Sequence, residues 1–329
     1  MTDLIIVGAG PAGLATAIAA SQAALDYEVL EKGVLVNSIF HFPRQMTFFT
    51  TPELLEIGGL PFVTPYEKPT QAEALRYYRR VSDTYRLKIR LGDEVRAIEP
   101  RDGGFRVHTR SGAREAVRES RTVVLATGYY DHPIRLGIPG EDLPHVSHYY
   151  DDPHAFYRKR ALVVGGKNSA AIAALELFRA GATTVTLVHR GAGISDSVKY
   201  WIKPDIENRI KEGSIEARFS TRVLEIHEGH VIVEKDGARA ELEADGVFLL
   251  TGYRPDVELL RAAGVRVFPE TLKPDHDPDT LETNVPGLYV AGAVVSGRET
   301  NRIFIENGRF HGDAIVASVR KHIDALRDR

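Results

Sequence analysis

The feature that most limits the fold of this chain is a strand, a glycine turn and a helix that occur in this order twice. In the first copy, the apolar run 4–7 leads into the glycine-rich stretch 8–13 and then into the alanine-rich segment 14–24. This pattern predicts a buried strand followed by a helix. A further apolar run at 27–30, closed by Glu31, predicts the next strand. Strands that alternate with helices favour a parallel sheet.

The second copy lies in the other half of the chain. The apolar run 161–164 precedes the stretch 165–170, a predicted helix, and a strand at 183–188 that is closed by His189 and Arg190. Two strand–helix–strand units of this kind imply two dinucleotide sites.

Further apolar runs complete each unit. A buried strand ends in Thr-Gly in both copies, within residues 121–128 and 246–252. A last strand at 288–292 and a final helix from about Asn301 have no place in the second unit, so we assign them to the first. Short antiparallel strands are predicted at 95–98 and 105–109 in the first copy and around 223–226 and 231–234 in the second.

These elements predict an α/β chain of two Rossmann-like dinucleotide-binding domains, each with three layers (sheet, sheet, helix). The second domain is expected to be inserted into the first. The expected boundaries are 1–147 and 255–329 for the two parts of the first domain, and 148–254 for the inserted one.

Composition excludes several classes of function. The 329 residues include no cysteine, which excludes disulfides, thiolate metal sites and a cysteine nucleophile, and we expect no metal site. A net charge of -3 gives no field suited to nucleic acid or an anionic membrane. No apolar run approaches the ~20 residues that span a bilayer, and residues 1–8 are typical of a strand rather than a signal peptide. We expect a cytoplasmic protein with small-molecule partners.

The first glycine turn is suited to a dinucleotide. Gly8 permits a tight turn, Gly10 lets the backbone approach a pyrophosphate, and Gly13 lets the helix pack on the strand. The helix N-terminus then faces the phosphates. Glu31 stands where an acid accepts hydrogen bonds from ribose hydroxyls. The alternative is a turn that only connects strand and helix.

The second turn departs from this pattern, because Lys167 and Ala170 replace its middle and third glycines. A turn without a ligand is therefore the alternative here. The basic pair His189 and Arg190 stands where an enzyme that binds NAD would place an acid, and it suits the 2′-phosphate of NADP, with Lys167 or Lys199 as additional cations. His189 alone would be more typical of a surface histidine.

Two further segments are candidates for flavin contacts. The stretch 45–50 follows the Glu31 strand, where a flavin ring would continue, although its aromatic side chains could instead belong to the core. The stretch 302–308 is expected to aim a helix N-terminus at N1 and O2 of the flavin, where a helix dipole stabilises the reduced anion. The alternative is a helix that only packs.

The expected cofactor contacts can now be named in full. Those with FAD are Gly8, Gly10, Pro11, Ala12, Gly13, Glu31, Lys32, Asn37, Gln45, Thr47, Phe48, Val95, Ala126, Thr127, Gly128, Gly292, Ala293, Ile303 and Phe304. Those with NADPH are Gly165, Lys167, Asn168, Ser169, Ala170, His189, Arg190, Lys199, Thr251, Gly252 and Tyr253.

With its two glycine turns, two Thr-Gly junctions and Val-Pro-Gly-Leu-Tyr-Val-Ala-Gly tail, the chain resembles the thioredoxin reductase-like flavoproteins over nearly its whole length. Within that group, the phrases at 47–58, 138–144, 165–170 and 303–308 resemble those of the bacillithiol disulfide reductases. The resemblance implies FAD, a preference for NADPH, an inserted NADPH domain, and a homodimer or larger assembly.

Three positions depart from the family. The dithiol of thioredoxin reductases would fall at residues 148–151, which begin with His148 and end with Asp151. The single cysteine expected in the first glycine turn of bacillithiol reductases is Ala12, and the acid that usually holds the ribityl chain is replaced by Ala293, which follows Gly292. His148 is a candidate proton donor to a reduced acceptor, with a structural role as the alternative.

The sequence therefore predicts an NADPH-dependent FAD oxidoreductase in which a hydride passes from nicotinamide to flavin. Without cysteine, the electrons are expected to leave the flavin directly for a small molecule or a small redox protein. Two alternatives stay open: a flavin monooxygenase, which the aromatic stretches 126–130 and 147–150 resemble, and a redox sensor that binds both nucleotides without turnover.

Overall fold

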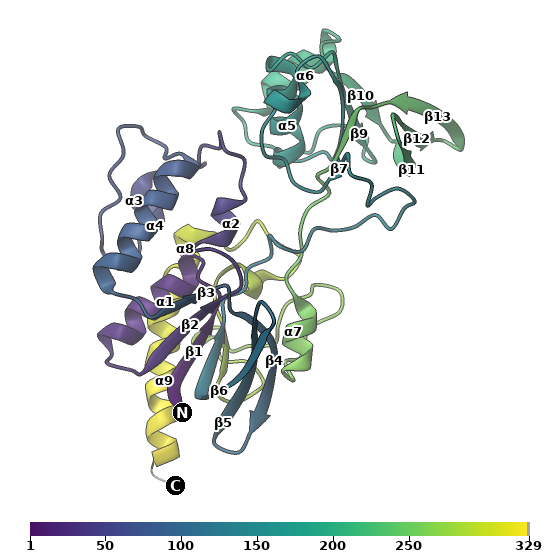
Figure 1. Ribbon diagram of the computed structural model, residues 1–329. Helices are drawn as coiled ribbons and strands as arrows, with labels where there is room; N and C mark the ends of the chain where they lie inside the picture. The colour runs from purple at the N-terminus through teal and green to yellow at the C-terminus, as the bar shows by residue number, and fades with distance from the viewer. Residues whose placement is uncertain (328–329) are drawn as a thin grey trace. The chain divides into compact units, whose positions relative to one another are not determined.

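The computed structural model describes residues 1–327, and the chain divides into two compact units (Figure 1). Unit 1 consists of Met1–His132 together with Tyr253–Arg329, and unit 2 is Pro133–Gly252. The second unit is therefore inserted into the first, as predicted. It begins earlier than the expected boundary after residue 147, because strand β7 (Val146–Ser147) pairs with β14 (Gly246–Leu249) of the inserted unit.

Unit 1 is built on one mixed sheet. Its long strand β6 pairs antiparallel with β5 through its first half, and parallel with both β1 and β15 through its second half. The helical layer and the antiparallel ribbon can thus lie on opposite faces of the same parallel strands. The strands are β3 (Ile89–Leu91), β2 (Tyr27–Glu31), β1 (Thr2–Val7), β6 (Arg114–Leu125), β5 (Gly104–Ser111) and β4 (Glu94–Arg101) in order of pairing, with β15 (Leu288–Val290) beside β6.

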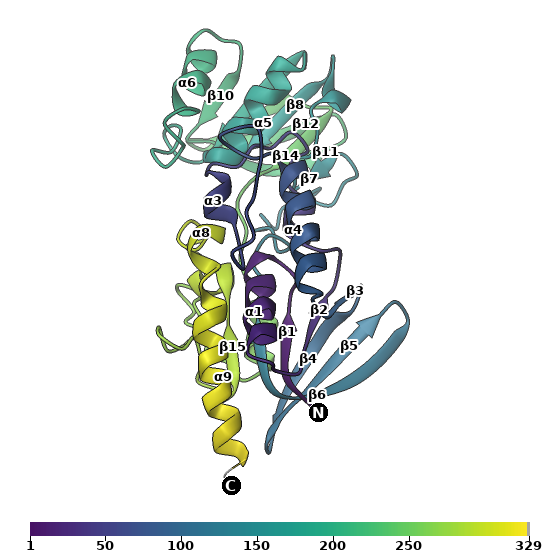
Figure 2. The same ribbon diagram turned by 90° about the vertical axis from the view of Figure 1, so that its left-hand side faces the viewer.

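Alternate residues of β1 serve two different cores. Leu4 and Ile6 are buried with the helices α1 and α9, which lie side by side (Figures 1 and 2). Ile5 and Val7 are buried on the other face, with residues of the β4–β5 ribbon and α7. Each buried side chain of this size contributes about 1.5 to 3 kcal/mol. The main helices are α1 (Pro11–Gln22), α4 (Gln71–Tyr85), α7 (Val257–Ala262) and α9 (His311–Arg327), and the shorter ones are α2 (Asn37–Phe40), α3 (Pro52–Leu55) and α8 (Ile305–Gly308).

Unit 2 repeats the three layers around a parallel five-stranded sheet. Ala161 and Val163 of its central strand face the helical side, and Leu162 and Val164 face a three-stranded antiparallel sheet. The parallel strands are β10 (Glu216–Phe219), β9 (Thr184–His189), β8 (Arg160–Val164), β14 and β7; the helices are α5 (Asn168–Arg179) and α6 (Lys203–Lys211); the antiparallel strands are β11 (Arg222–His227), β12 (His230–Lys235) and β13 (Ala238–Glu243). The predicted fold class is confirmed.

Several element boundaries differ from the prediction. Helix α1 begins at Pro11 rather than residue 14, since proline is well suited to the first helical position. The final helix does not run from Asn301: α8 ends at Gly308 and α9 begins at His311. Helix α4 was not predicted, although Thr70 and Glu73 form a capping box that the sequence pattern would have revealed.

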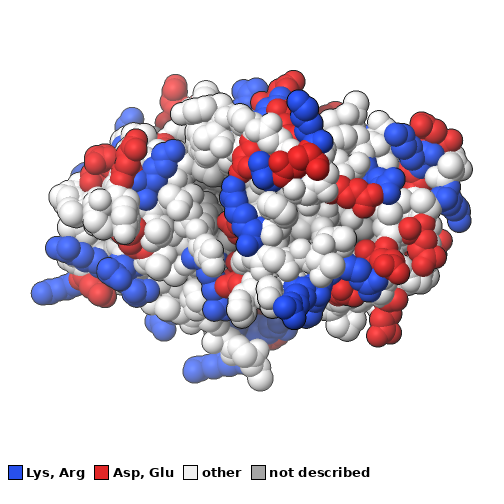
Figure 3. Space-filling model, turned by 90° about the horizontal axis from the view of Figure 1, so that it is seen from above, with Lys and Arg blue, Asp and Glu red and all other residues white. Residues whose placement is uncertain are grey.

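No helix among residues 1–327 is both long and apolar enough to cross a membrane. On the face shown in Figure 3, basic and acidic side chains are interspersed. That face therefore offers no broad field of one sign.

Candidate functional site

The first glycine turn lies between β1 and α1, and glycine is suited to each of its three positions for a different reason. Gly8 has φ +105, and a Cβ there would lie 2.5 Å from the carbonyl oxygen of Ala126. A Cβ at Gly13 would lie 2.0 Å from the carbonyl oxygen of Gly8. At Gly10 a Cβ would meet nothing within 4 Å. The backbone at Gly10 is therefore open to a ligand, as the sequence predicts.

The N-terminus of α1 presents unpaired amides at this turn. No side chain caps the helix, and within the described part of the chain the N–H groups of Gly10, Ala12 and Gly13 donate to no acceptor. Pro11 has no N–H to satisfy. Helix N-terminal amides and the positive end of the helix dipole together bind anions. The turn thus fits a pyrophosphate.

Glu31 lies at the end of β2 and supports the same turn. Its carboxylate is buried and accepts from the amides of Ala9 and Gly33, both at 2.8 Å. Burial raises the pKa of this carboxyl, and the two amide bonds partly oppose that shift. Each carboxylate oxygen retains a second lone pair for a ribose hydroxyl. Next to it, Lys32 pairs with Asp131 at 3.1 Å.

Other expected FAD residues follow strands at the same edge of the sheet. Residues 126–128 follow β6, Gly292 and Ala293 follow β15, and Asn37 opens α2 after the Glu31 strand. A Cβ at Gly292 would lie 2.7 Å from the Cβ of Ala12. The turn at Gly292 and Ala293 therefore lies directly against the first glycine turn.

The stretch 45–50 divides between surface and core. Phe48 is buried in the core, its amide donates to the carbonyl of Pro69, and its ring is edge-on to Phe42. Gln45 and Thr47 are exposed. Phe48 therefore packs in the core, and its contact with a flavin stays a prediction.

Three more expected FAD residues are spread over unit 1. Val95 belongs to β4 and packs on the core of the β4–β5 side. Ile303 is half-buried, and Phe304, just before α8, is 47% exposed. Because α8 spans only Ile305–Gly308, it aligns too few peptide units for the helix dipole expected at 302–308.

The second glycine turn is restrained at its first two glycines. Gly165 has φ +154, and a Cβ there would lie 2.7 Å from the carbonyl oxygen of Leu250 and 2.8 Å from the Cβ of Ala170. A Cβ at Gly166 would lie 2.4 Å from Nε2 of His189. Ala170 therefore fills the place of the third glycine, and the imidazole of His189 lies over Gly166.

The N-terminus of α5 gathers most of the expected NADPH residues. Asn168 opens the helix, and its Oδ1 accepts from the amide of Lys199 at 2.9 Å. This bond fixes the loop after β9 to the helix N-terminus. Lys167 and Ser169 are exposed beside it, and no side chain caps the helix.

His189 and Arg190 differ in charge. Burial, and secondarily the neighbouring Arg190, lower the pKa of His189. The imidazole is therefore largely neutral at neutral pH in the ligand-free turn. Arg190 is exposed and keeps its charge. The electrostatic attraction for a 2′-phosphate therefore falls mainly on Arg190.

The Thr-Gly junction of unit 2 lies at the unit boundary. The hydroxyl of Thr251 donates to the carbonyl of Ile134 at 2.6 Å, and Gly252 has φ +102. Tyr253 belongs to unit 1, where its ring packs 4.6 Å from that of Tyr130. Tyr253 is thus an expected NADPH residue that falls in unit 1, and its contact with NADPH stays a prediction.

His148 lies in unit 2 beside a buried acid. Its Nε2 is 3.3 Å from Oε1 of Glu141, whose carboxylate also accepts from the amides of Leu136 at 2.8 Å and Gly137 at 2.7 Å. This setting gives His148 a structural partner. Within residues 1–327, no group of three or more potential ligand side chains could hold a metal ion.

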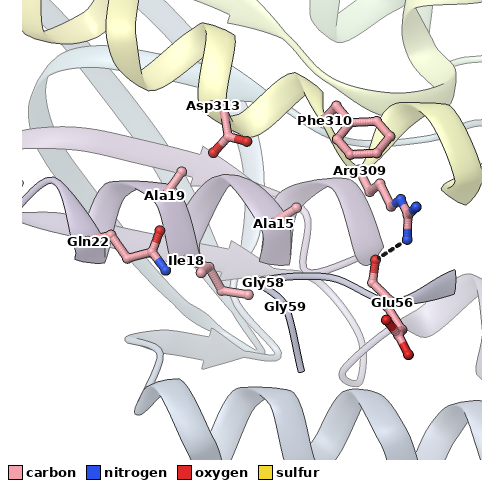
Figure 4. Close-up of a pocket in the computed structure, with 10 residues that line it drawn as sticks. All are labelled: Ala15, Ile18, Ala19, Gln22, Glu56, Gly58, Gly59, Arg309, Phe310 and Asp313. Carbon is pink, nitrogen blue, oxygen red and sulfur yellow. Dashed lines mark hydrogen bonds between the residues drawn. The ribbon is translucent and has the colours of Figure 1, made fainter. Parts of the chain in front are cut away.

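A groove of about 350 Å³ lies along the outer face of α1, beginning one helical turn beyond the first glycine turn (Figure 4). Arg309 spans one end of it by donating to the carbonyls of Glu53 at 2.7 Å and Glu56 at 2.8 Å. This groove was not predictable from the sequence, because its walls come from segments that are distant along the chain. It is lined by Ala15, Ile18, Ala19, Gln22, Glu56, Gly58, Gly59, Arg309, Phe310 and Asp313.

Comparison with known proteins covers almost the entire chain. A family model described as pyridine nucleotide-disulphide oxidoreductase matches residues 5–292. Bacilliredoxin reductase Bdr of Bacillus subtilis (strain 168) is 41% identical over 321 residues, which are 96% of this chain and 97% of that protein.

Two solved structures agree with this match. Bacillithiol disulfide reductase Bdr from Bacillus cereus has a TM-score of 0.95 at 39% identity, covering 97% of this chain and 99% of that one. The Bdr from Staphylococcus aureus has a TM-score of 0.91 at 36% identity, covering 99% and 98%. The resemblance stated from the sequence motifs is confirmed.

Proposed function

The chain belongs to the pyridine nucleotide-disulphide oxidoreductase family, and from this premise we propose that unit 1 binds FAD, that unit 2 binds NADPH, and that the enzyme reduces a small acceptor. As a member it is an oxidoreductase, and FAD and NADPH are the cofactors of this family. The assignment of each cofactor to one unit and to particular residues is our proposal.

One observation supports the assignment of FAD to unit 1 most strongly. The first glycine turn combines open space at Gly10, three unpaired amides and the buried carboxylate of Glu31. An anion at the helix N-terminus and a diol at Glu31 together describe the ADP half of a dinucleotide.

Unit 2 carries the opposite charge at the matching position. Arg190 follows β9, where Glu31 closes β2, and a guanidinium pairs with a phosphate through two parallel hydrogen bonds. We propose that Arg190, with Lys167 or Lys199, selects NADPH through its 2′-phosphate. His189 contributes shape more than charge, since its imidazole lies over Gly166.

When bound, the flavin accepts a hydride equivalent from the reduced nicotinamide and passes electrons onward. The residues of this chain bind and orient the two nucleotides. Because the chain has no cysteine, it cannot form a mixed disulfide with a substrate. We therefore propose direct delivery of electrons from the flavin to the acceptor, without a thiol relay.

The class of acceptor follows from the relatives and from this missing thiol. The relatives' names describe reductases of bacilliredoxin and of bacillithiol disulfide. For this chain we propose a low-molecular-weight disulfide, a quinone or a small redox protein. A monooxygenase is not favoured, since the Bdr proteins that match this chain at 36% to 41% identity are named for the reduction of bacilliredoxin or of bacillithiol disulfide. We further propose that the enzyme acts as a homodimer or a larger homo-oligomer.

The FAD site is tested by a bulky side chain at Gly10. Gly10→Leu should abolish FAD occupancy after purification without changing the fold, because the added side chain enters space that is open in the ligand-free turn. Gly193→Leu is a matched control, since a Cβ there also meets nothing within 4 Å. Full FAD occupancy in Gly10→Leu would show that the first turn is not the site.

The acceptor is tested with the wild-type protein. NADPH consumption under anaerobic conditions should require an added acceptor, and a panel of disulfides, quinones and small redox proteins identifies the class. Negligible turnover with every acceptor would support a redox sensor, whereas oxygen consumption matched by product hydroxylation would support a monooxygenase.

A further inference from the structure

The backbone amide of Gly292 donates a hydrogen bond to an imidazole. Its nitrogen lies 3.1 Å from Nδ1 of His311, the first residue of α9. Since an N–H only donates, Nδ1 must present a lone pair, which places the ring proton on Nε2 and leaves the imidazole neutral. A protonated His311 has two N–H groups and cannot make this bond.

The Gly292 amide, which donates to His311, lies where the turn after β15 meets the first glycine turn and the end of α8. Gly292 has φ +72, and a Cβ there would lie 2.7 Å from the Cβ of Ala12 in the first glycine turn. From the other side, a Cβ at Gly308 would lie 3.3 Å from the Cα of Gly292. Ala293, the next residue, has no polar side chain to anchor the turn. The Gly292–Ala293 turn is therefore held through its own backbone, including the amide that donates to the imidazole of His311.

The surroundings disfavour a charge on His311. Burial, and secondarily His276, lower its pKa below the ordinary 6.5. Position at the N-terminus of the long helix α9 acts in the same direction, because the helix dipole repels a cation there. The nearest acids along the chain are Glu306 on α8 and Asp313 on α9, and Asp313 lines the groove outside α1 (Figure 4).

We propose that His311 is a positioning residue, whose neutral imidazole holds the Gly292–Ala293 turn against the first glycine turn, so that protonation of His311 weakens the binding of FAD. This inference rests on the proposed FAD site in unit 1. It also supplies a means of holding the turn in the absence of an acid at position 293.

The direction of the pH effect follows from the lowered pKa of His311. In the unfolded chain, or once the turn is released, the imidazole of His311 takes up a proton near its ordinary pKa. In the native turn it does so only at lower pH. The stabilisation from His311 is therefore complete above about pH 6.5 and is lost as the pH falls from there through the folded pKa. One proton changes the affinity by at most about tenfold per pH unit.

Glu31 complicates this measurement, because its carboxyl pKa is raised and it also gains a proton on acidification. Variants at position 311 separate the two groups. His311→Asn keeps an acceptor oxygen for the Gly292 amide but does not titrate, whereas His311→Leu removes the acceptor. His322→Asn, on the same helix, is the matched control for loss of a histidine.

The experiment measures the dissociation constant of FAD by flavin fluorescence between about pH 5.5 and 8 for all four proteins. Wild type and His322→Asn should lose affinity several-fold on acidification. His311→Asn should bind FAD as wild type does at pH 8 and should have a flatter pH profile. His311→Leu should bind severalfold more weakly at pH 8.

The outcomes distinguish this inference from the function on which it rests. Equal pH profiles for wild type and His311→Asn, with tight FAD binding at pH 8, would overturn the role of His311 alone. Wild-type protein that binds no FAD at pH 8 would overturn the proposed FAD site as well. Tight binding by His311→Leu at all pH values would also contradict the inference.

Discussion

The two glycine turns occupy equivalent places in their units, and they share one restraint and differ in another. A Cβ at the first glycine would approach a backbone carbonyl in both turns, at 2.5 Å for Gly8 and at 2.7 Å for Gly165. At the third position Gly13 is required, because a Cβ there would lie 2.0 Å from a backbone carbonyl, whereas the second turn accommodates the methyl group of Ala170. The turn after the strand therefore needs its first glycine in both units, but the helix comes close enough to require a third glycine only in unit 1.

The turns differ in charge as well. Glu31 closes the second strand in unit 1 as a buried acid held by two amides, whereas the exposed Arg190 follows the equivalent strand in unit 2. An acid accepts from ribose hydroxyls, and a guanidinium binds a phosphate. We propose that the same backbone plan binds two different dinucleotides because the residues at one strand end differ.

Gly13→Ala should give the largest effect on stability. The added methyl collides with the Gly8 carbonyl, which cannot move aside as a flexible side chain could, so we expect a loss of about 3 kcal/mol in the free energy of unfolding, the upper end for overpacking. Urea unfolding of the FAD-free protein measures it. Gly10→Ala is the control and should change little. Equal losses for the two variants would contradict the assigned roles of these glycines.

Arg190→Ala should weaken NADPH binding while leaving NADH binding nearly unchanged. A lost charged contact costs about 1.5 to 3 kcal/mol, or roughly ten- to over a hundredfold in affinity. Titration of the purified variant with each nucleotide tests this. Arg239→Ala, at an exposed site on β13 of the same unit, should bind both nucleotides as wild type does. Equal weakening for NADPH and NADH would place Arg190 elsewhere.

Glu31→Gln should destabilise the FAD-free protein by about 1 to 2 kcal/mol, because the amide group cannot accept from both Ala9 and Gly33.

The same substitution should also change how the free energy of unfolding depends on pH. Folding raises the pKa of Glu31 above its ordinary 4.5, so ionisation destabilises the native state as the pH rises from about 4.5 through the folded pKa. This slope in wild type should be absent in Glu31→Gln and retained in Glu115→Gln, which changes an exposed acid on β6. Identical slopes in the three proteins would rule out Glu31 as its source.

Ala170→Gly should have the smallest effect. It supplies the third glycine of the usual pattern, but removing a helical methyl costs only about 0.5 to 1 kcal/mol. Thermal unfolding and NADPH titration together test this expectation. A strong gain in NADPH affinity would mean that the methyl of Ala170 obstructs the site, contrary to its packing role against Gly165.

Much of this architecture could be predicted from the sequence, because long apolar runs and glycine turns are local signals. The paired strands, the inserted unit and the contact at Gly13 follow from such patterns. The break between α8 and α9 was not predictable in this way, since it occurs at Gly308, which packs on the distant Gly292.

The candidate site shows the same division. The roles proposed for Glu31 and Arg190 were predicted from their places after predicted strands, and they stay predictions. The lowered pKa of His189 was not predictable, because it depends on burial. The contact of His311 with Gly292 joins two segments that are separated by the Phe304 region and α8, so no local motif predicts it. For Phe48 the sequence leaves two interpretations open, because an aromatic residue near a cofactor site and one in the core have the same local sequence.

We propose above all that NADPH bound to unit 2 reduces FAD bound to unit 1, and that the electrons then leave the flavin without a thiol relay. Anaerobic stopped-flow mixing of the FAD-loaded protein with NADPH tests it most directly, through the loss of the oxidised flavin absorbance. We expect rapid bleaching, recovery of the absorbance on addition of an acceptor, and unchanged rates after treatment with a thiol-blocking reagent. Failure of NADPH to bleach the flavin, or loss of activity of the pure protein after that treatment, would contradict it.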